Sequence, residues 1–187
     1  MELQKVTIQT KKPKINRVES KNGHRGHGTL LEASNSVKQN FLNSIAEINV
    51  SYKPTKPAGP RIDSSSTAHE YLRMLFPEET VALQEQFIIL YLNRANQVLG
   101  AYHAFTGGIT GTVADIRIIM GVALKSMACG MVISHNHPSG SLKPSSADKH
   151  LTDKIEEAGK LMDINLLDHI ILSPEGGYYS FADEGQL

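Results

Sequence analysis

The sequence predicts an α/β fold, a three-layer α/β/α sandwich built around a mixed sheet. From about residue 64 to the end, short apolar runs of strand length alternate with amphipathic segments of helix length. One run is apolar throughout, which is typical of a strand covered on both faces, and the next strand returns beside it after a short turn. Strands and helices that alternate in this way bury a sheet between layers of helices.

The expected elements begin with a helix and a pair of strands. Hydroxyl side chains at 64–67 can cap a helix over 68–75, which Pro77 ends. The apolar run within 86–92 predicts a buried strand. The turn sequence Asn-Arg-Ala-Asn then leads into an antiparallel strand over 97–105.

Glycines interrupt the chain before its second half, in which helices and strands alternate. We expect a helix over 115–127, a strand over 130–134, a second amphipathic helix over 145–162, a buried strand over 165–172 and an edge strand over 178–181. The first of these helices carries apolar residues three and four positions apart: Ile116, Ile119, Met120, Ala123, Leu124 and Met127. This stripe should pack against the sheet.

The formal net charge of zero hides an uneven distribution of charge along the chain. Residues 1–60 contain ten Lys and Arg against four Glu, which leaves nine basic and fifteen acidic residues for 61–187. The first segment is rich in Pro and Gly, and only 36–50 has the pattern of a short amphipathic helix. We therefore predict a basic N-terminal arm or linker over 1–60, partly disordered, and a folded domain over 61–187. Such an arm could bind nucleic acid through its charge, or it could be a solvated tail.

The composition excludes several classes of protein. No apolar run reaches the roughly 18–20 residues of a membrane span, and the polar, Lys-rich start does not resemble a secretory signal. The one cysteine, Cys129, excludes an internal disulfide framework and a cysteine-based zinc cluster, and we expect it to be a small core residue. We therefore expect a soluble, cytoplasmic protein, and its oligomeric state is left open.

Two histidines two positions apart are the first candidates for chemistry. His135 and His137 lie where a strand is expected to end, so both rings leave the same face with α-carbons roughly 6.6 Å apart. This separation allows both imidazoles to approach one zinc ion at about 2.0–2.1 Å. Histidine pairs also occur for packing reasons, so the pair alone does not establish a metal site.

A helix N-terminus follows the histidines. Ser145 is expected to be its N-cap and Asp148 its third residue, the arrangement of a capping box. The helix dipole favours an ionised Asp148, and a fixed carboxylate can be a third metal ligand. Two His and one Asp leave a fourth tetrahedral position for water, as in catalytic zinc sites. Taken singly, Ser145 and Asp148 are explained by capping alone.

The combination of these residues resembles a known motif. His-Asn-His-Pro-Ser-Gly at 135–140, followed by Pro-Ser-x-x-Asp at 144–148, resembles the metalloprotease motif of JAMM (MPN) domains, in particular of their RadC-like branch. The resemblance covers roughly 62–187. It includes Leu-Asp-His-Ile-Ile at 167–171 and Tyr-Tyr-Ser-Phe-Ala at 178–182.

The resemblance implies a cytidine-deaminase-like fold and a zinc ion held by His135, His137 and Asp148. The family motif also contains an upstream glutamate on the first core strand, which we match to Glu85. Glu85 is then expected to act as the general base that activates water at the zinc. Without the resemblance, it would be interpreted as an exposed carboxylate before a strand, with other glutamates nearby.

The implied activity is that of a zinc-dependent metallopeptidase that cleaves a peptide or isopeptide bond, with Ser145 as hydrogen-bond donor to the developing oxyanion. The spacing of the residues by itself indicates no more than a hydrolytic zinc site. Two alternatives stay open. One is a metal-dependent nuclease or DNA-repair accessory protein, in line with the basic arm and the name once given to the family. The other is a non-catalytic MPN-like interaction module.

A further histidine lies on the expected strand over 165–172. Asp168 and His169 are consecutive, so their side chains should face opposite ways. The pair could take a carboxylate–histidine role behind a metal ligand. We prefer the interpretation of a satisfied core residue, and we expect His150 to lie on the surface.

Overall fold

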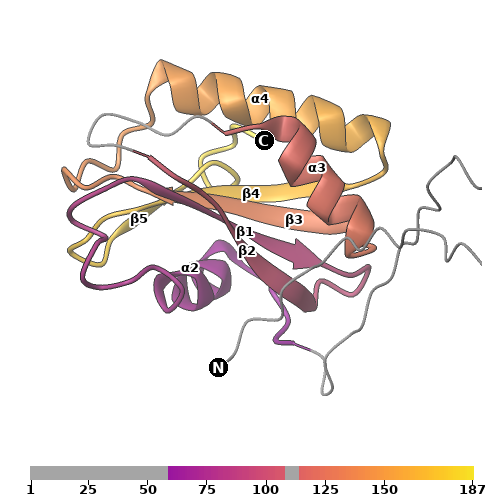
Figure 1. The fold of residues 1–187 in the computed structure, drawn as a ribbon, viewed down its shortest axis with the longest axis horizontal. Helices are drawn as coiled ribbons and strands as arrows, with labels where there is room; N and C mark the ends of the chain where they lie inside the picture. The colour runs from indigo at the N-terminus through magenta and orange to yellow at the C-terminus, as the bar shows by residue number, and fades with distance from the viewer. Residues whose placement is uncertain (1–58, 108–113) are drawn as a thin grey trace, which may run out of the picture. The chain divides into compact units, whose positions relative to one another are not determined.

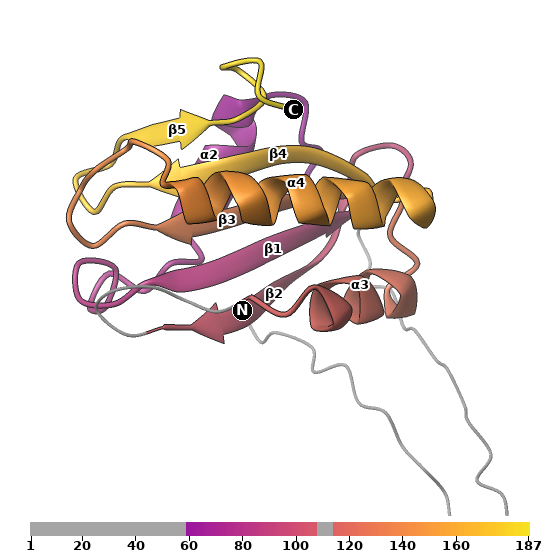
Figure 2. The ribbon, with the colours of Figure 1, turned by 90° about the horizontal axis from the view of Figure 1, so that it is seen from above.

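The computed structural model describes residues 59–107 and 114–187. Within these residues, five strands form one mixed sheet in the order β2-β1-β3-β4-β5. Helix α2 covers one face of the sheet, and α3 and α4 cover the other (Figures 1 and 2). The predicted three-layer α/β fold is therefore confirmed. Nearly all of the predicted arm, including the amphipathic stretch over 36–50, lies outside the described residues.

The first helix is shifted toward the N-terminus relative to its predicted range of 68–75, and the next two strands form at or within one residue of their predicted ranges. Helix α2, Ser65–Arg73, has Ser64 as its N-cap. Strand β1, Gln86–Leu92, is buried along its whole length. It pairs antiparallel with β2, Val98–Thr106, on one side and with β3, Gly130–Asn136, on the other. Because β3 extends two residues beyond its predicted end, His135 lies within the strand.

The second half of the domain adds two strands to the sheet on the side of β3. Strand β4, Asn165–Leu172, runs parallel to β3. A parallel pair needs a crossover connection, and α4, Ser146–Leu161, provides it across one face of the sheet. Strand β5, Tyr178–Ser180, pairs antiparallel with β4 at the edge. This topology places the end of β3 beside the start of α4.

The side chains of β1 alternate between two separate cores. Residues 88, 90 and 92 face α2, in a cluster with Leu72 and Ile170. Residues 87, 89 and 91 face α3 and α4, in a cluster with Ile119 and Ile155. Both faces of β1 are thus covered, which is the physical reason for its uninterrupted apolar run.

The predicted stripe of the middle helix is only partly correct. Helix α3, Ile116–Lys125, ends two residues earlier than expected. Leu124 and Met127 are 52% and 71% exposed instead of packing on the sheet. Met127 adopts a left-handed φ of 57°, so it leaves the helical path. The contact with the core is made by the remaining members of the stripe: the buried Ile119, Met120 and Ala123 and the half-buried Ile116.

The prediction that Cys129 is a core residue is wrong. The residue is exposed and carries a free thiol. It lies just before β3, where its backbone N–H donates to the carbonyl of Leu92 at 2.8 Å. The residues on either side of it, Ala128 and Gly130, are buried, whereas its own side chain faces solvent. None of the helices in the described ranges is long and apolar enough to span a membrane.

Candidate metal centre

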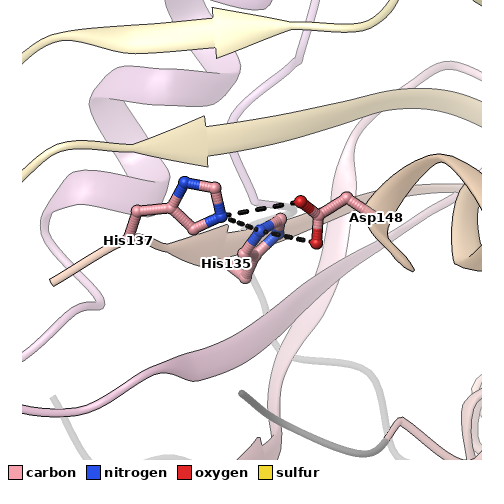
Figure 3. A group of neighbouring side chains, drawn as sticks. All are labelled: His135, His137 and Asp148. Carbon is pink, nitrogen blue, oxygen red and sulfur yellow. Dashed lines mark hydrogen bonds and ion pairs between the residues drawn. The ribbon is translucent and has the colours of Figure 1, made fainter. Parts of the chain in front are cut away.

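Three side chains converge where the end of β3 meets the first turn of α4 (Figure 3). His135 is the second-last residue of β3 and is 1% exposed. His137 directly follows the strand, and Asp148 lies in the first turn of α4. Together they are the one group in residues 59–107 and 114–187 in which at least three His, Cys, Asp or Glu side chains can reach a common metal ion.

The distances between the ligand atoms fit a tetrahedral zinc site. The Nε2 atoms of His135 and His137 are 3.0 Å apart. His135 Nε2 lies 3.2 Å from Asp148 Oδ1, and His137 Nε2 lies 3.6 Å from Asp148 Oδ2. Two ligands at about 2.0–2.1 Å from a tetrahedral zinc ion are about 3.3–3.4 Å from each other. The observed separations bracket this value.

The turn after β3 fixes the ring of His137. Gly140 has a left-handed φ of 77°, which favours glycine, and its N–H donates to the carbonyl of His137 at 2.9 Å. The turn brings the carbonyl of Ser141 to 2.6 Å from His137 Nδ1. Because a carbonyl only accepts, Nδ1 carries a hydrogen, and in the neutral ring Nε2 therefore keeps its lone pair. That lone pair points toward His135 and Asp148.

The predicted capping box at the start of α4 is confirmed. The hydroxyl of Ser145 accepts a hydrogen bond of 3.1 Å from the backbone N–H of Asp148. In return, Asp148 Oδ2 accepts one of 2.6 Å from the backbone N–H of Ser145. This pair of bonds fixes the carboxylate of Asp148 at the positive end of the helix dipole.

The electrostatics of the group favour a cation at its centre. The carboxylate of Asp148, 3.6 Å from Nε2, raises the pKa of His137 above its ordinary value. Burial alone would raise the pKa of Asp148, but the hydrogen bonds with His135 and His137 outweigh it and hold that pKa well below its usual range. An ionised carboxylate and imidazole nitrogens that point at one another need a proton or a metal ion between them. The donor set therefore fits zinc.

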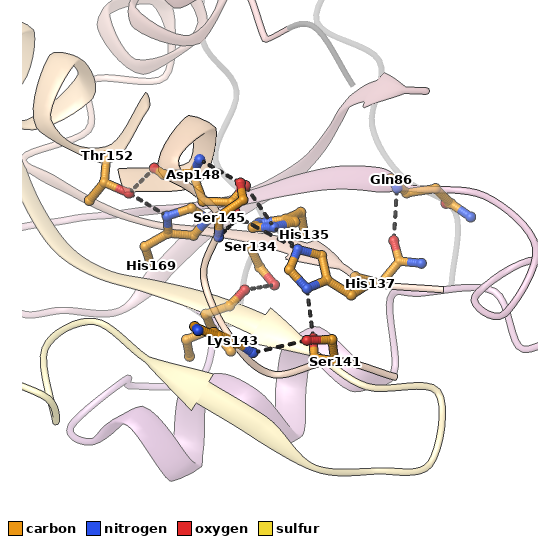
Figure 4. A network of polar contacts seen from close by, with 12 residues as sticks. Gln86, Ser134, His135, His137, Ser141, Lys143, Ser145, Asp148, Thr152 and His169 are labelled. Carbon is orange, nitrogen blue, oxygen red and sulfur yellow. Dashed lines mark hydrogen bonds and ion pairs between the residues drawn. The ribbon is translucent and has the colours of Figure 1, made fainter. Parts of the chain in front are cut away.

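His135 is held from behind by a second buried histidine. The Nδ1 atom of His135 lies 2.8 Å from Nε2 of His169, and Nδ1 of His169 lies 2.6 Å from the hydroxyl of Thr152 (Figure 4). Burial, then the charge of His135, lowers the pKa of His169 well below its ordinary value. Our preferred interpretation of His169 as a core residue only is therefore incomplete, because it contacts a predicted ligand.

The sequence did not single out Thr152, although a signal exists. Thr152 stands four residues after Asp148, so both lie on one face of α4. Asp168 and His169 have different partners, in line with the prediction that their side chains face opposite ways: the carboxylate of Asp168 accepts hydrogen bonds from the Ser180 hydroxyl and the Ala182 N–H. His150 is exposed, also as predicted.

Glu85 lies beside the group and not among its three converging ligands. It is partly exposed directly before β1, and with His137 it lines a cavity of about 510 Å³. The negative charge of Glu85 also contributes to the raised pKa of His137. The cavity is further bordered by Pro138 and Lys143 from the turn after β3. The structure thus brings Glu85 and one member of the ligand group, His137, to one surface depression.

Comparison with known proteins gives consistent matches. Residues 62–186 match the family model described as RadC-like JAB domain. A UPF0758 protein of Flavobacterium johnsoniae is 42% identical over 125 residues, which cover 67% of this chain and 53% of that protein. One of Porphyromonas gingivalis is 37% identical over 68% of this chain and 56% of its own, and one of Streptococcus gordonii is 41% identical over 56% and 46%. The chain spans about half the length of these curated relatives.

Proposed function

The chain belongs to the family of RadC-like JAB domains, and from this premise we propose that it is a zinc-dependent hydrolase of peptide or isopeptide bonds. The convergence of His135, His137 and Asp148 within 3.6 Å of one another carries the proposal. Three ligands leave a fourth position of a tetrahedral ion for water, which is the open arrangement of catalytic zinc. The adjoining cavity gives a substrate access to that position.

His135, His137 and Asp148 would hold the zinc ion, which would supply a Lewis acid able to lower the pKa of water to about 7 and to polarise a carbonyl. Glu85 accepts the proton of the attacking water and delivers it to the leaving amine. Its place at the cavity, next to His137, supports this role. The carboxylate needs no coordination of its own, so its position outside the ligand group agrees with the assignment.

Ser145 assists at the carbonyl oxygen of the substrate. Its hydroxyl accepts a hydrogen bond from the backbone N–H of Asp148, and this acceptor role leaves the hydroxyl hydrogen for a substrate oxygen. The capping box joins Ser145 to Asp148, a proposed metal ligand, and so fixes the position of the Ser145 hydroxyl relative to the proposed metal site. A preorganised donor of this kind stabilises negative charge in the transition state.

Hydrolysis by Glu85→Gln tests the proposal. The full-length chain, loaded with zinc, is assayed on fluorogenic peptides and on an isopeptide-linked lysine substrate. We expect Glu85→Gln to lose about 10²–10⁴-fold in kcat and to retain its zinc. Glu79→Gln, an exposed carboxylate on the preceding segment, is the control and should keep full activity. Equal activity of Glu85→Gln and the wild type would remove the assigned base.

The uneven charge of the chain favours a second, separate activity. We propose that residues 1–60, with ten basic against four acidic residues, bind nucleic acid. Fluorescence anisotropy of the full chain with labelled DNA measures this affinity. The affinity should fall steeply between about 50 and 200 mM salt, with a slope of log K against log salt roughly proportional to the number of phosphates contacted. Binding that is absent at low salt, or insensitive to salt, would contradict this.

A further inference from the structure

We propose that Thr152 and His169 are positioning residues that set the tautomer of His135, so that His135 presents a lone pair on Nε2 to the metal. The inference rests on the proposed function, because it takes the three-residue group to hold zinc. It concerns two residues that do not touch the metal themselves. Their role follows from the direction of three consecutive hydrogen bonds.

The first hydrogen bond starts at Thr152. Its hydroxyl donates to the backbone carbonyl of Asp148, one turn earlier in α4, at 2.7 Å. A threonine hydroxyl has one hydrogen, so this bond uses it. The hydroxyl oxygen can then only accept from Nδ1 of His169, which lies 2.6 Å away.

The position of the hydrogen on His169 determines the direction of the third hydrogen bond, which joins His169 to His135. With its hydrogen on Nδ1, neutral His169 has a lone pair on Nε2. This atom lies 2.8 Å from Nδ1 of His135 and can only accept from it. His135 therefore carries its hydrogen on Nδ1, and its Nε2 is left with a lone pair.

The lone pair is directed at the metal position. His135 Nε2 is 3.0 Å from His137 Nε2 and 3.2 Å from the carboxylate of Asp148. A hydrogen on this atom would block coordination, since a metal ion binds the unprotonated nitrogen of imidazole. The series of hydrogen bonds thus begins at the backbone carbonyl of one proposed ligand, Asp148. It ends at another, His135, whose Nε2 is left with a lone pair (Figure 4).

The surroundings keep this arrangement from being exchanged for bonds to water. Thr152, His169 and His135 are each at most 1% exposed. The ring of His169 stacks on Phe181 with centroids 4.7 Å apart, and Phe87 stacks on His135 at 6.2 Å. In the parallel register, His169 pairs with Ile133, two residues before His135, so both rings lie on one face of the sheet. Each polar atom must therefore find its partner within the chain.

Two substitutions interrupt the series of hydrogen bonds from Thr152 through His169 to His135, called the relay below, at different points. Thr152→Val removes the hydroxyl at nearly constant volume, and His169→Phe keeps an aromatic ring in the stack while removing both nitrogens. Thr152→Ser retains the hydroxyl and should restore wild-type behaviour. Ser134→Ala is the matched control, because it deletes a buried hydroxyl from β3 that donates to the Ile170 carbonyl at 2.7 Å, outside the relay.

The experiment measures zinc affinity and the histidine tautomer in the full-length chain. Competition against a chromophoric chelator should show a loss of about 10–100-fold in zinc affinity for Thr152→Val and His169→Phe, the usual effect of removing a partner behind a metal ligand. Thr152→Ser and Ser134→Ala should stay within a few-fold of the wild type. Long-range ¹⁵N–¹H NMR of labelled histidines should show the hydrogen of His135 on Nδ1 in the wild type, with that preference lost in Thr152→Val.

The outcomes separate this inference from the proposed function. Wild-type zinc affinity in a folded Thr152→Val, or a wild-type His135 that carries its hydrogen on Nε2, overturns the relay and leaves the hydrolase proposal standing. A loss of zinc affinity in Ser134→Ala as large as that in Thr152→Val also counts against the relay. Conversely, correct tautomers and zinc affinities without any peptide hydrolysis support the relay and contradict the hydrolase.

Discussion

The side-chain oxygen of Asn136 accepts a hydrogen bond of 2.7 Å from the backbone N–H of Gln86 at the start of β1. The amide nitrogen of the same side chain donates to the carbonyls of Val81, at 2.7 Å, and Gln84, at 2.9 Å. Glu85 lies between two of these partners. One fully buried side chain, placed between His135 and His137 in the sequence, therefore holds the backbone on both sides of the proposed base.

Replacing Asn136 should separate catalysis from metal binding. We expect Asn136→Ala to lower the free energy of unfolding by at least about 1–3 kcal/mol, because buried backbone groups lose their partner. The rate of hydrolysis should fall by more than the decrease in the fraction of folded protein accounts for, while the number of zinc ions bound per chain stays at that of the wild type. Urea unfolding, kinetics and metal analysis check this. Asn93→Ala is the control, since Asn93 also binds nearby backbone N–H groups but in the turn before β2. A parallel loss of activity in both variants would contradict the assignment.

Zinc should bind at one ion per chain and stabilise the fold. At a free zinc concentration about 100 times the Kd, the free energy of unfolding should rise by about 2.7 kcal/mol, because the metal binds the folded state only. His137→Ala should lose this stabilisation, whereas His150→Ala, an exposed histidine on α4, should retain it. Elemental analysis and thermal unfolding with and without chelator measure both effects. Stabilisation of His137→Ala equal to that of the wild type would exclude His137 as a ligand.

Two N-cap serines separate the structural and chemical roles of Ser145. Ser64 caps α2 and Ser145 caps α4 in the same way, through an N–H at 3.1 Å in both cases. Replacement of either by Ala should cost about 0.5–2 kcal/mol of stability. Only Ser145→Ala should also lose hydrolysis, by about 10²–10³-fold in kcat, the effect of removing an oxyanion donor. If the two variants keep equal activity, Ser145 is a helix cap alone.

Two glycines in helical segments should respond oppositely to alanine. In α4, a β-carbon at Gly159 would lie 2.3 Å from the carbonyl oxygen of Ile164, too close for any real contact. In α3, a β-carbon at Gly121 meets nothing within 4 Å. We expect Gly159→Ala to destabilise the domain and Gly121→Ala to stabilise it by about 0.5–1 kcal/mol, the difference in helix propensity. Urea unfolding of both variants tests the packing of α4 against the start of β4.

The buried carboxyl of Asp168 should make stability depend on pH. Burial raises the pKa of Asp168 above its ordinary value, so the folded state holds this proton more tightly than the unfolded chain. The resulting contribution to stability is complete below the ordinary carboxyl pKa of about 3.9 and is lost as the pH rises through the raised value. Asp168→Asn has no proton to lose there. Its free energy of unfolding should therefore increase relative to the wild type as pH rises from about 4 to 7.

This difference is measured by urea unfolding of both proteins at several pH values with chelator present. Other titrating groups are common to the two proteins and cancel in the comparison. A difference that stays constant with pH would show that burial does not change the proton affinity of Asp168.

Local patterns in the sequence were sufficient for the elements and for the three converging residues. The continuous apolar run of β1 and the capping box of Ser145 and Asp148 each depend on contacts within a few residues, so spacing alone predicts them. His135 and His137 share a face because strand side chains alternate with a period of two. The same local reasoning failed at Leu124, which lies within α3 but is exposed, and at Cys129, which directly precedes β3 and faces solvent.

Contacts between distant segments were decided by the tertiary structure alone. Asn136 and Gln86 are 50 positions apart, and His135 and His169 are 34 apart. These pairs meet because β3 lies between β1 and β4 with one particular register, and register is set by the packing of whole faces of the sheet. The sequence by itself therefore determined which residues are able to bind a metal. Only the assembled sheet determined which neighbours orient them.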